Sequence, residues 1–132
     1  MEFFRSLDLV CQEKELQEKL SLENLESYSD LLFPLEQVQG KQVKIGGIWG
    51  EFQLFRQEIA GGLRFALLDC PNALSWTLTC PSPPNNDKLI IHLTINRQHK
   101  DPEFIEEIEE FLSDHLNKLA SYLALEGDLN RS

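Results

Sequence analysis

The residues of this chain best suited to metal binding or acid–base chemistry are its three histidines, His92, His99 and His115. Metal sites usually take two ligands at short spacing, such as HxH or HxxxH, and no two of these histidines have such a spacing. We therefore expect neither a metal site nor a cofactor. All three histidines are interpreted as surface or rim residues: His92 on the outer face of a sheet near Thr77, and His115 at the edge of an apolar helix stripe.

The cysteines, Cys11, Cys70 and Cys80, are odd in number and lack the CxxC spacing of a zinc or redox site, so we expect no disulfide. Cys80 is expected to point inward and to be inert, and Cys70 to be more exposed, without a neighbouring base in sequence. No GxSxG turn is present. A Ser–His–Asp set stays open, because its members need not be close in sequence, but no catalytic residue is predicted.

Two short segments have unusual composition. Residues 46–50, Gly-Gly-Ile-Trp-Gly, lack the lysine of a phosphate-binding loop and the spacing of a dinucleotide fingerprint. We interpret them as a bulge or a close strand crossing. Residues 81–86 contain a PxxP spacing and are interpreted as an exposed loop between strands.

Residues 1–33 are predicted to be helical, as one bent helix or two. The apolar side chains near the start recur at spacings of three and four, and residues 12–20 are rich in strong helix formers. Pro34 is expected to end this region. Residues 1–8 carry acids where a signal peptide needs a basic flank, which together with the cysteines favours a reducing, cytoplasmic compartment.

Residues 43–96 are predicted to form an antiparallel meander of four to five strands. Residues 43–48 are a possible strand, residues 49–59 a firmer one, and residues 60–62 a hairpin turn. Alternation of apolar and polar side chains predicts three further strands and their registers. The expected pairs are as follows: Ile59 with Leu63, Phe55 with Leu67, Leu67 with Trp76, Phe65 with Leu78, Trp76 with Leu93, and Leu78 with Ile91.

Residues 102–125 are predicted to form a long helix. Asp101 is its N-cap candidate, Pro102 suits its first position, and Gly127 is expected to stop it. Its apolar stripe should cover the sheet face that carries Trp76. The sequence thus predicts a single α+β domain over residues 1–132, with N-terminal helices, an antiparallel meander and a C-terminal helix packed on one sheet face.

The chain is acidic: 22 Asp and Glu oppose 12 Lys and Arg among 132 residues, for a formal charge of −10. The excess of acid lies in residues 1–40 and 101–132, where carboxylate pairs such as Glu106-Glu107 and Glu109-Glu110 are interpreted as a solvated helix face. This charge argues against nucleic acid as a partner, and no apolar run is long enough to span a membrane. The negative charge is compatible with a protein partner, including a basic one.

In size, acidity and helix–meander–helix order the chain loosely resembles small dimeric secretion chaperones. The resemblance covers gross features only, without a diagnostic motif, and transfers no residue roles. It favours a non-enzymatic protein-binding or assembly protein, with an enzyme role less favoured. Part of the apolar surface of the N-terminal region should stay exposed on a monomer, which predicts a homodimer joined through residues 1–33. The alternative is a small-ligand-binding protein or minor enzyme with a pocket between a curled sheet and the last helix.

Overall fold

The fold is α+β, with one seven-stranded antiparallel sheet in the order β1-β7-β6-β5-β4-β3-β2. The structure is a computed structural model that describes residues 1–82, 84, 87–96 and 101–131, with side chains only as far as Leu123. The elements in chain order are β1 (Glu2–Asp8), α1 (Glu13–Lys19), α2 (Leu25–Tyr28), β2 (Leu32–Pro34), β3 (Gln42–Gly47), β4 (Phe52–Ile59), β5 (Gly62–Leu67), β6 (Ser75–Thr79), β7 (Lys88–Thr94) and α3 (Pro102–Arg131).

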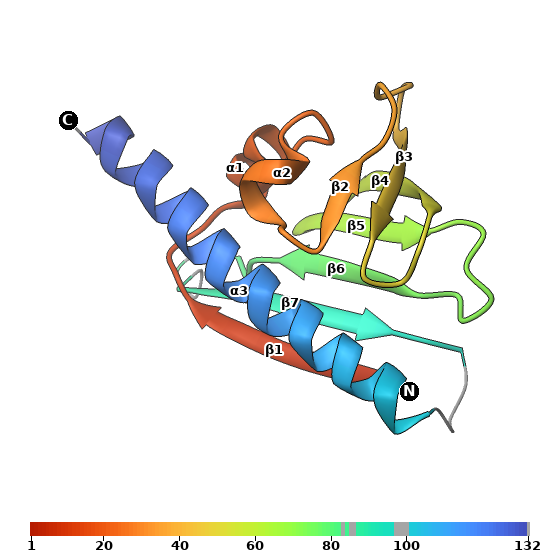
Figure 1. Ribbon diagram of the computed structural model, residues 1–132. Helices are drawn as coiled ribbons and strands as arrows, with labels where there is room; N and C mark the ends of the chain where they lie inside the picture. The colour runs from red at the N-terminus through yellow and green to blue at the C-terminus, as the bar shows by residue number, and fades with distance from the viewer. Residues whose placement is uncertain (83, 85–86, 97–100, 132) are drawn as a thin grey trace.

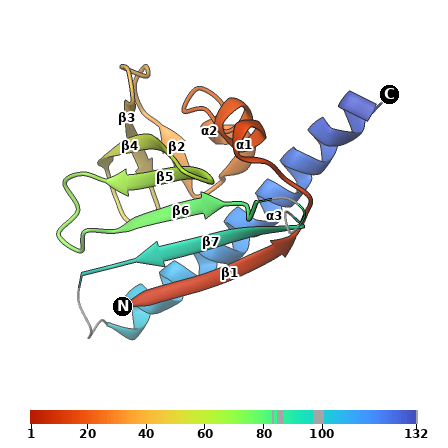
Figure 2. The same cartoon turned by 180° about the vertical axis from the view of Figure 1, so that it is seen from behind.

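The sheet curls around the long helix α3. Strands β2, β3 and β4 stand steeply to β1 and β7, and α3 runs diagonally across the concave face (Figure 1). The short helices α1 and α2 lie beside α3 at the same face, whereas the view from behind shows the opposite face of the sheet without a helix (Figure 2). The concave face and its helices therefore enclose the core, as expected for the face that carries Trp76, which is 2 % exposed.

Residues 2–8 form strand β1, so the predicted helix over this part of residues 1–33 is wrong. Phe3, Arg5 and Leu7 face inward, and the residues between them face solvent. This two-residue period was hidden by Phe4, an apolar side chain on the outer face, 58 % exposed. β1 pairs along its length with β7, about 90 residues away in sequence, and such distant pairing overrides local helix propensity. Residues 32–34 likewise form an edge strand, β2.

The predicted registers are confirmed between β6 and β7 and shifted elsewhere. Trp76 pairs with Leu93, and Leu78 with Ile91, as expected. Phe65, however, pairs with Trp76 and not Leu78, because the connection after Leu67 is two residues longer than the predicted four-residue turn. That shift of two residues keeps every side chain on its expected face.

The hairpin between β4 and β5 also differs by one residue, since Ile59 pairs with Gly62 and not with Leu63. A two-residue turn connects the strands, with Gly61 at a φ of +88°. A side chain at Gly62 would place a Cβ 1.9 Å from the Leu78 carbonyl oxygen, so only glycine fits there. Of the predicted strand over residues 49–59, only Phe52–Ile59 is extended.

Helix α3 continues to Arg131, beyond the predicted end at residue 125. Gly127 does not stop it. A glycine inside a helix costs only about 1 kcal/mol relative to alanine, and here the backbone remains helical through it. The described part of the chain contains no helix that is both long and apolar enough to cross a membrane.

Cys11 and Cys80 form a disulfide, contrary to the expectation drawn from cysteine number and spacing. The Cα atoms are 6.1 Å apart although 69 residues separate them in sequence. The segment between β1 and α1 folds back onto the end of β6, a proximity that sequence spacing does not reveal. Since disulfides are uncommon in reducing compartments, the cysteines no longer support the expected cytoplasmic location. Cys70 is free and half-buried.

Candidate functional site

A pocket of about 300 Å³ opens where the loops at one end of the sheet meet the first turns of α3. Most of its lining is apolar, with one carboxylate and one free thiol. The lining residues are Ile48, Trp49, Phe52, Cys70, Pro71, Asn72, Leu74, Phe104 and Glu107. A concave, mainly apolar surface with a few polar groups is typical of small-ligand sites, and its volume lies at the small end of their usual range.

The glycine-rich segment over residues 46–50 builds one wall of this pocket. A Cβ at Gly47 would lie 2.2 Å from the Leu31 carbonyl oxygen, so glycine is required for β2 to pass this close to β3. This confirms the interpretation of a close strand crossing. Gly50, with a φ of +111°, then turns the chain into β4. Trp49, between them, packs on the Phe111 ring of α3 with centroids 5.0 Å apart.

An aromatic cluster continues inward from Trp49. The Phe111 ring contacts Trp76 with centroids 5.0 Å apart and stacks on His115 at 5.1 Å. Trp76 and His115 meet edge to face at 6.2 Å. Phe111 therefore touches the pocket wall on one side and the buried Trp76–His115 pair on the other.

His115 is buried, 1 % exposed, so the prediction of a rim histidine is wrong. Its Nδ1 lies 3.1 Å from the Tyr28 carbonyl oxygen. A carbonyl can only accept, so Nδ1 carries the hydrogen. Burial lowers the pKa of His115 to about 4, which the hydrogen bond to Tyr28 opposes only in part, so the ring is neutral at pH 7. The sequence did contain a signal for this burial, because His115 lies four residues from both Phe111 and Leu119 on the apolar stripe.

Three buried nitrogen atoms of this cluster have no hydrogen-bond partner among the residues that the structure describes. They are Trp49 Nε1, Trp76 Nε1 and His115 Nε2. Buried polar atoms in folded proteins nearly always have partners, and an unpartnered one costs about 1–3 kcal/mol. All three atoms belong to rings that contact Phe111, and of these rings only Trp49 lines the pocket.

The remaining sequence-derived candidates do not join this site. His92 lies on the outer face opposite Thr77, as predicted, stacked on Phe4 and 3.0 Å from a Glu2 carboxylate oxygen. His99 and much of the 81–86 loop lie outside the described residues. Glu109 pairs with Arg5 of β1, whereas Glu107 lines the pocket and is not simply part of a solvated face. Over the described part of the chain, no cluster of three His, Cys, Asp or Glu side chains could hold a metal ion.

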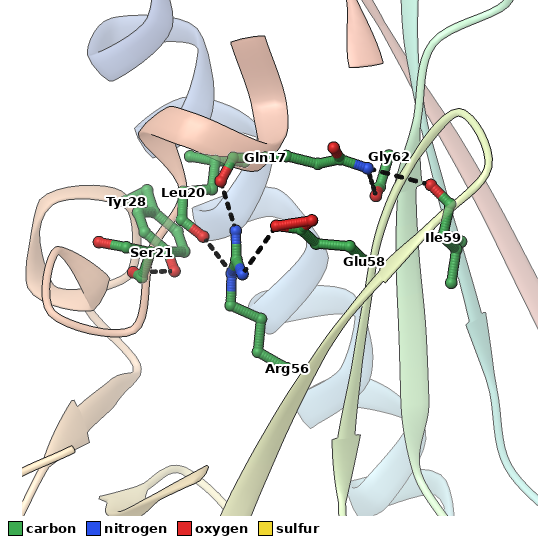
Figure 3. A network of polar contacts seen from close by, with 8 residues as sticks. All are labelled: Gln17, Leu20, Ser21, Tyr28, Arg56, Glu58, Ile59 and Gly62. Atoms are coloured by element: carbon green, nitrogen blue, oxygen red, sulfur yellow. Dashed lines mark hydrogen bonds and ion pairs between the residues drawn. The ribbon is translucent and has the colours of Figure 1, made fainter. Parts of the chain in front are cut away.

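A second polar region holds α1 against the sheet (Figure 3). Arg56 of β4 donates from Nε to the Leu20 carbonyl at 2.8 Å and from a terminal nitrogen to the Gln17 carbonyl at 2.6 Å. Gln17 in turn donates its side-chain amide to the carbonyls of Ile59 and Gly62, at 3.2 and 3.0 Å. Arg56 thereby binds carbonyls at the C-terminal end of α1, where a positive charge is favourable. Each of these donors is engaged with backbone, so we assign this corner a structural role.

The comparisons with known proteins identify a fold and no family. No protein-family profile matches the chain, and no curated protein matches its sequence. Among solved structures it is similar to a START superfamily protein from Mycobacterium smegmatis, with 12 % identity, a TM-score of 0.64, and coverage of 94 % of this chain and 98 % of that one.

Two further solved structures are equally similar. The protein XoxI from Bacillus cereus has 13 % identity and a TM-score of 0.63, with coverage of 95 % of this chain and 97 % of that one. An uncharacterized protein from Bacillus thuringiensis has 10 % identity and a TM-score of 0.63, with coverage of 93 % and 99 % respectively. At these identities the likeness concerns the fold alone, and the chain has a START-like α+β fold.

Proposed function

We propose that this protein binds a small, mainly apolar molecule in the pocket between the loop ends of the sheet and the first turns of α3. The observation that carries the proposal is the pocket of about 300 Å³, whose aromatic wall, Trp49, packs on Phe111 at the entrance to the buried cluster. The START-like fold supports it, since proteins of the START/helix-grip superfamily often bind small ligands. Small-ligand binding is the alternative to the assembly role that the sequence favours.

The pocket favours a compact ligand. Its volume suits a molecule of one to three rings, and the half-buried rings of Trp49, Phe52 and Phe104 offer flat apolar surface. Glu107 and Asn72 are the polar side chains of the lining. Binding therefore derives mostly from burial of apolar area, at about 25 cal/mol per Å² before the cost of association is subtracted.

The test uses N-phenyl-1-naphthylamine, an uncharged dye that becomes fluorescent in apolar surroundings. We expect saturable binding to the wild-type protein. Cys70→Phe should abolish it by filling the pocket with a ring, whereas Cys70→Ser, which leaves the volume almost unchanged, should bind like wild type. Near-ultraviolet circular dichroism should show that both variants are folded.

Two results would overturn the proposal. One is the absence of saturable dye binding to the wild-type protein. The other is equal binding to Cys70→Phe and Cys70→Ser, which would place the dye elsewhere, for example in the pocket lined by Ser27, Asn117, Lys118, Ser121 and Tyr122.

A further inference from the structure

The three unpartnered nitrogen atoms differ in what they offer a ligand. An indole Nε1 is only a donor, so Trp49 and Trp76 each offer one N–H. His115 Nδ1 carries the ring hydrogen and donates it to Tyr28, so Nε2 presents a lone pair and is an acceptor. Trp76 and His115 are 2 % and 1 % exposed, and their rings meet edge to face, so one buried ring offers a donor and its neighbour an acceptor.

We propose that the natural ligand is an uncharged ring alcohol or phenol, whose hydroxyl accepts a hydrogen bond from the indole of Trp76 and donates one to Nε2 of His115. This inference deepens the proposed function and rests on it. A hydroxyl is the smallest group that both donates and accepts, and one such group satisfies both buried atoms. Without a ligand hydroxyl, both buried atoms would stay unpaired. The hydroxyl therefore contributes more to the binding free energy than the apolar area that it replaces.

Other polar groups fit these atoms less well. A carboxylate has no hydrogen to donate to Nε2, and an ammonium has no lone pair for the indole N–H. Either ion would also lose its hydration among Trp76, Phe111 and His115, where the described residues supply no opposite charge. Arg56, a cation on the concave face, is already engaged with the Gln17 and Leu20 carbonyls.

Phe111 lies between the pocket wall and this pair. Its ring contacts Trp49 at the pocket wall and also Trp76 and His115 behind it. The ligand body therefore occupies the pocket beside Trp49, and the Phe111 side chain rotates to let the hydroxyl reach His115.

The experiment compares 2-naphthol with 2-methylnaphthalene as competitors of N-phenyl-1-naphthylamine. The two molecules have nearly the same shape and differ in a hydroxyl against a methyl group. Transfer from water to an apolar site favours the methyl compound, so burial alone predicts tighter binding of 2-methylnaphthalene. We expect the opposite order in the wild-type protein, with 2-naphthol at least about tenfold tighter, as one well-formed buried hydrogen bond allows.

His115→Phe is the matched variant, since it keeps an aromatic ring and removes the acceptor. It should lose the preference for 2-naphthol and leave the affinity for 2-methylnaphthalene nearly unchanged. Trp76→Phe removes the donor and should lose part of the preference for 2-naphthol. It provides a second test if His115→Phe does not fold.

The outcomes separate the two proposals. If the dye does not bind, the proposed function fails. If the dye binds and both competitors displace it equally, or 2-methylnaphthalene displaces it better, the hydroxyl site is refuted while the ligand pocket stands.

Discussion

The two polar regions of the concave face are built in opposite ways. At the α1 corner, Arg56 and Gln17 direct their donors at backbone carbonyls, and Tyr28 donates its hydroxyl to the Ser21 carbonyl at 2.7 Å. In the aromatic cluster under α3, Trp49, Trp76 and His115 each keep one ring nitrogen without a described partner. The first region uses its polar groups to hold the fold, and the second leaves them available. That difference is what separates a structural network from a candidate binding site.

The largest expected effect of a substitution lies in the cluster. Trp76→Ala should lower the free energy of unfolding by about 3–5 kcal/mol, because Trp76 is buried against Phe65 and Phe111 and its removal leaves a large cavity. Denaturant melts at equal protein concentration measure it. A loss below about 1 kcal/mol would contradict the packing of α3 on this face.

The next effect concerns pH. A histidine in an unfolded chain titrates near pH 6.5, whereas burial lowers the pKa of His115 to about 4. Between these values the unfolded chain binds the proton and the folded chain does not. Stability from this group is therefore complete above about pH 6.5 and falls by about 3 kcal/mol as the pH drops toward 4.

Denaturant melts from pH 7 to pH 4 should show that loss in wild type and a smaller loss in His115→Phe. Equal pH dependence in wild type and His115→Phe would mean that His115 is not buried as a neutral ring.

At the α1 corner the expected loss is smaller. Arg56→Met keeps most of the apolar stem and removes the hydrogen bonds to the Gln17 and Leu20 carbonyls, which should cost about 2 kcal/mol. Arg64→Met, on the outer face of β5, serves as the control and should change stability by less than about 0.5 kcal/mol. Dye binding should be unchanged in both variants, since neither residue lines the pocket. A loss of dye binding in Arg56→Met would connect the two regions and remove the distinction between them.

The smallest effect concerns assembly, which stays a prediction. Apolar side chains in residues 1–33 remain exposed, among them Phe33 at 45 % on edge strand β2. We expect a homodimer joined through this region, tighter at about 0.3 M salt than at about 0.02 M, because salt screens the repulsion between acidic chains. Light scattering measures it, with Phe33→Asp expected to weaken the dimer and Leu68→Asp, outside residues 1–33, expected not to. A monomer at high concentration would remove the dimer, and with it the chaperone-like assembly role that the sequence favoured.

Alternation along residues 74–95 predicted the β6–β7 pairing correctly because one face of these strands is buried and the other is not. The same reasoning failed for residues 2–8, because Phe4 on the outer face obscured the two-residue period and the partner strand, β7, is far away in sequence. Local pattern predicts which face a side chain takes, but not which distant strand receives it.

The candidate site was predictable only in its parts. The glycine-rich segment over residues 46–50 was read correctly as a close crossing, yet nothing in sequence showed that the crossing places Trp49 on Phe111. His115 was assigned to a rim because it was placed at the edge of the apolar stripe, although its spacing from Phe111 and Leu119 favoured the core. The Cys11–Cys80 disulfide depends on the same long-range folding of β1 that the sequence pattern concealed.

The most direct test follows the two indole N–H signals in the ¹H–¹⁵N spectrum, since the chain has only 2 tryptophans, Trp49 and Trp76. The side-chain amide of Gln17, held by the Ile59 and Gly62 carbonyls, reports on the α1 corner in the same spectrum. Titration with 2-naphthol should shift both indole signals in proportion to dye displacement and leave the Gln17 amide in place. Unmoved indole signals at a concentration that displaces the dye, or shifts confined to the α1 corner, would contradict a ligand site beneath α3.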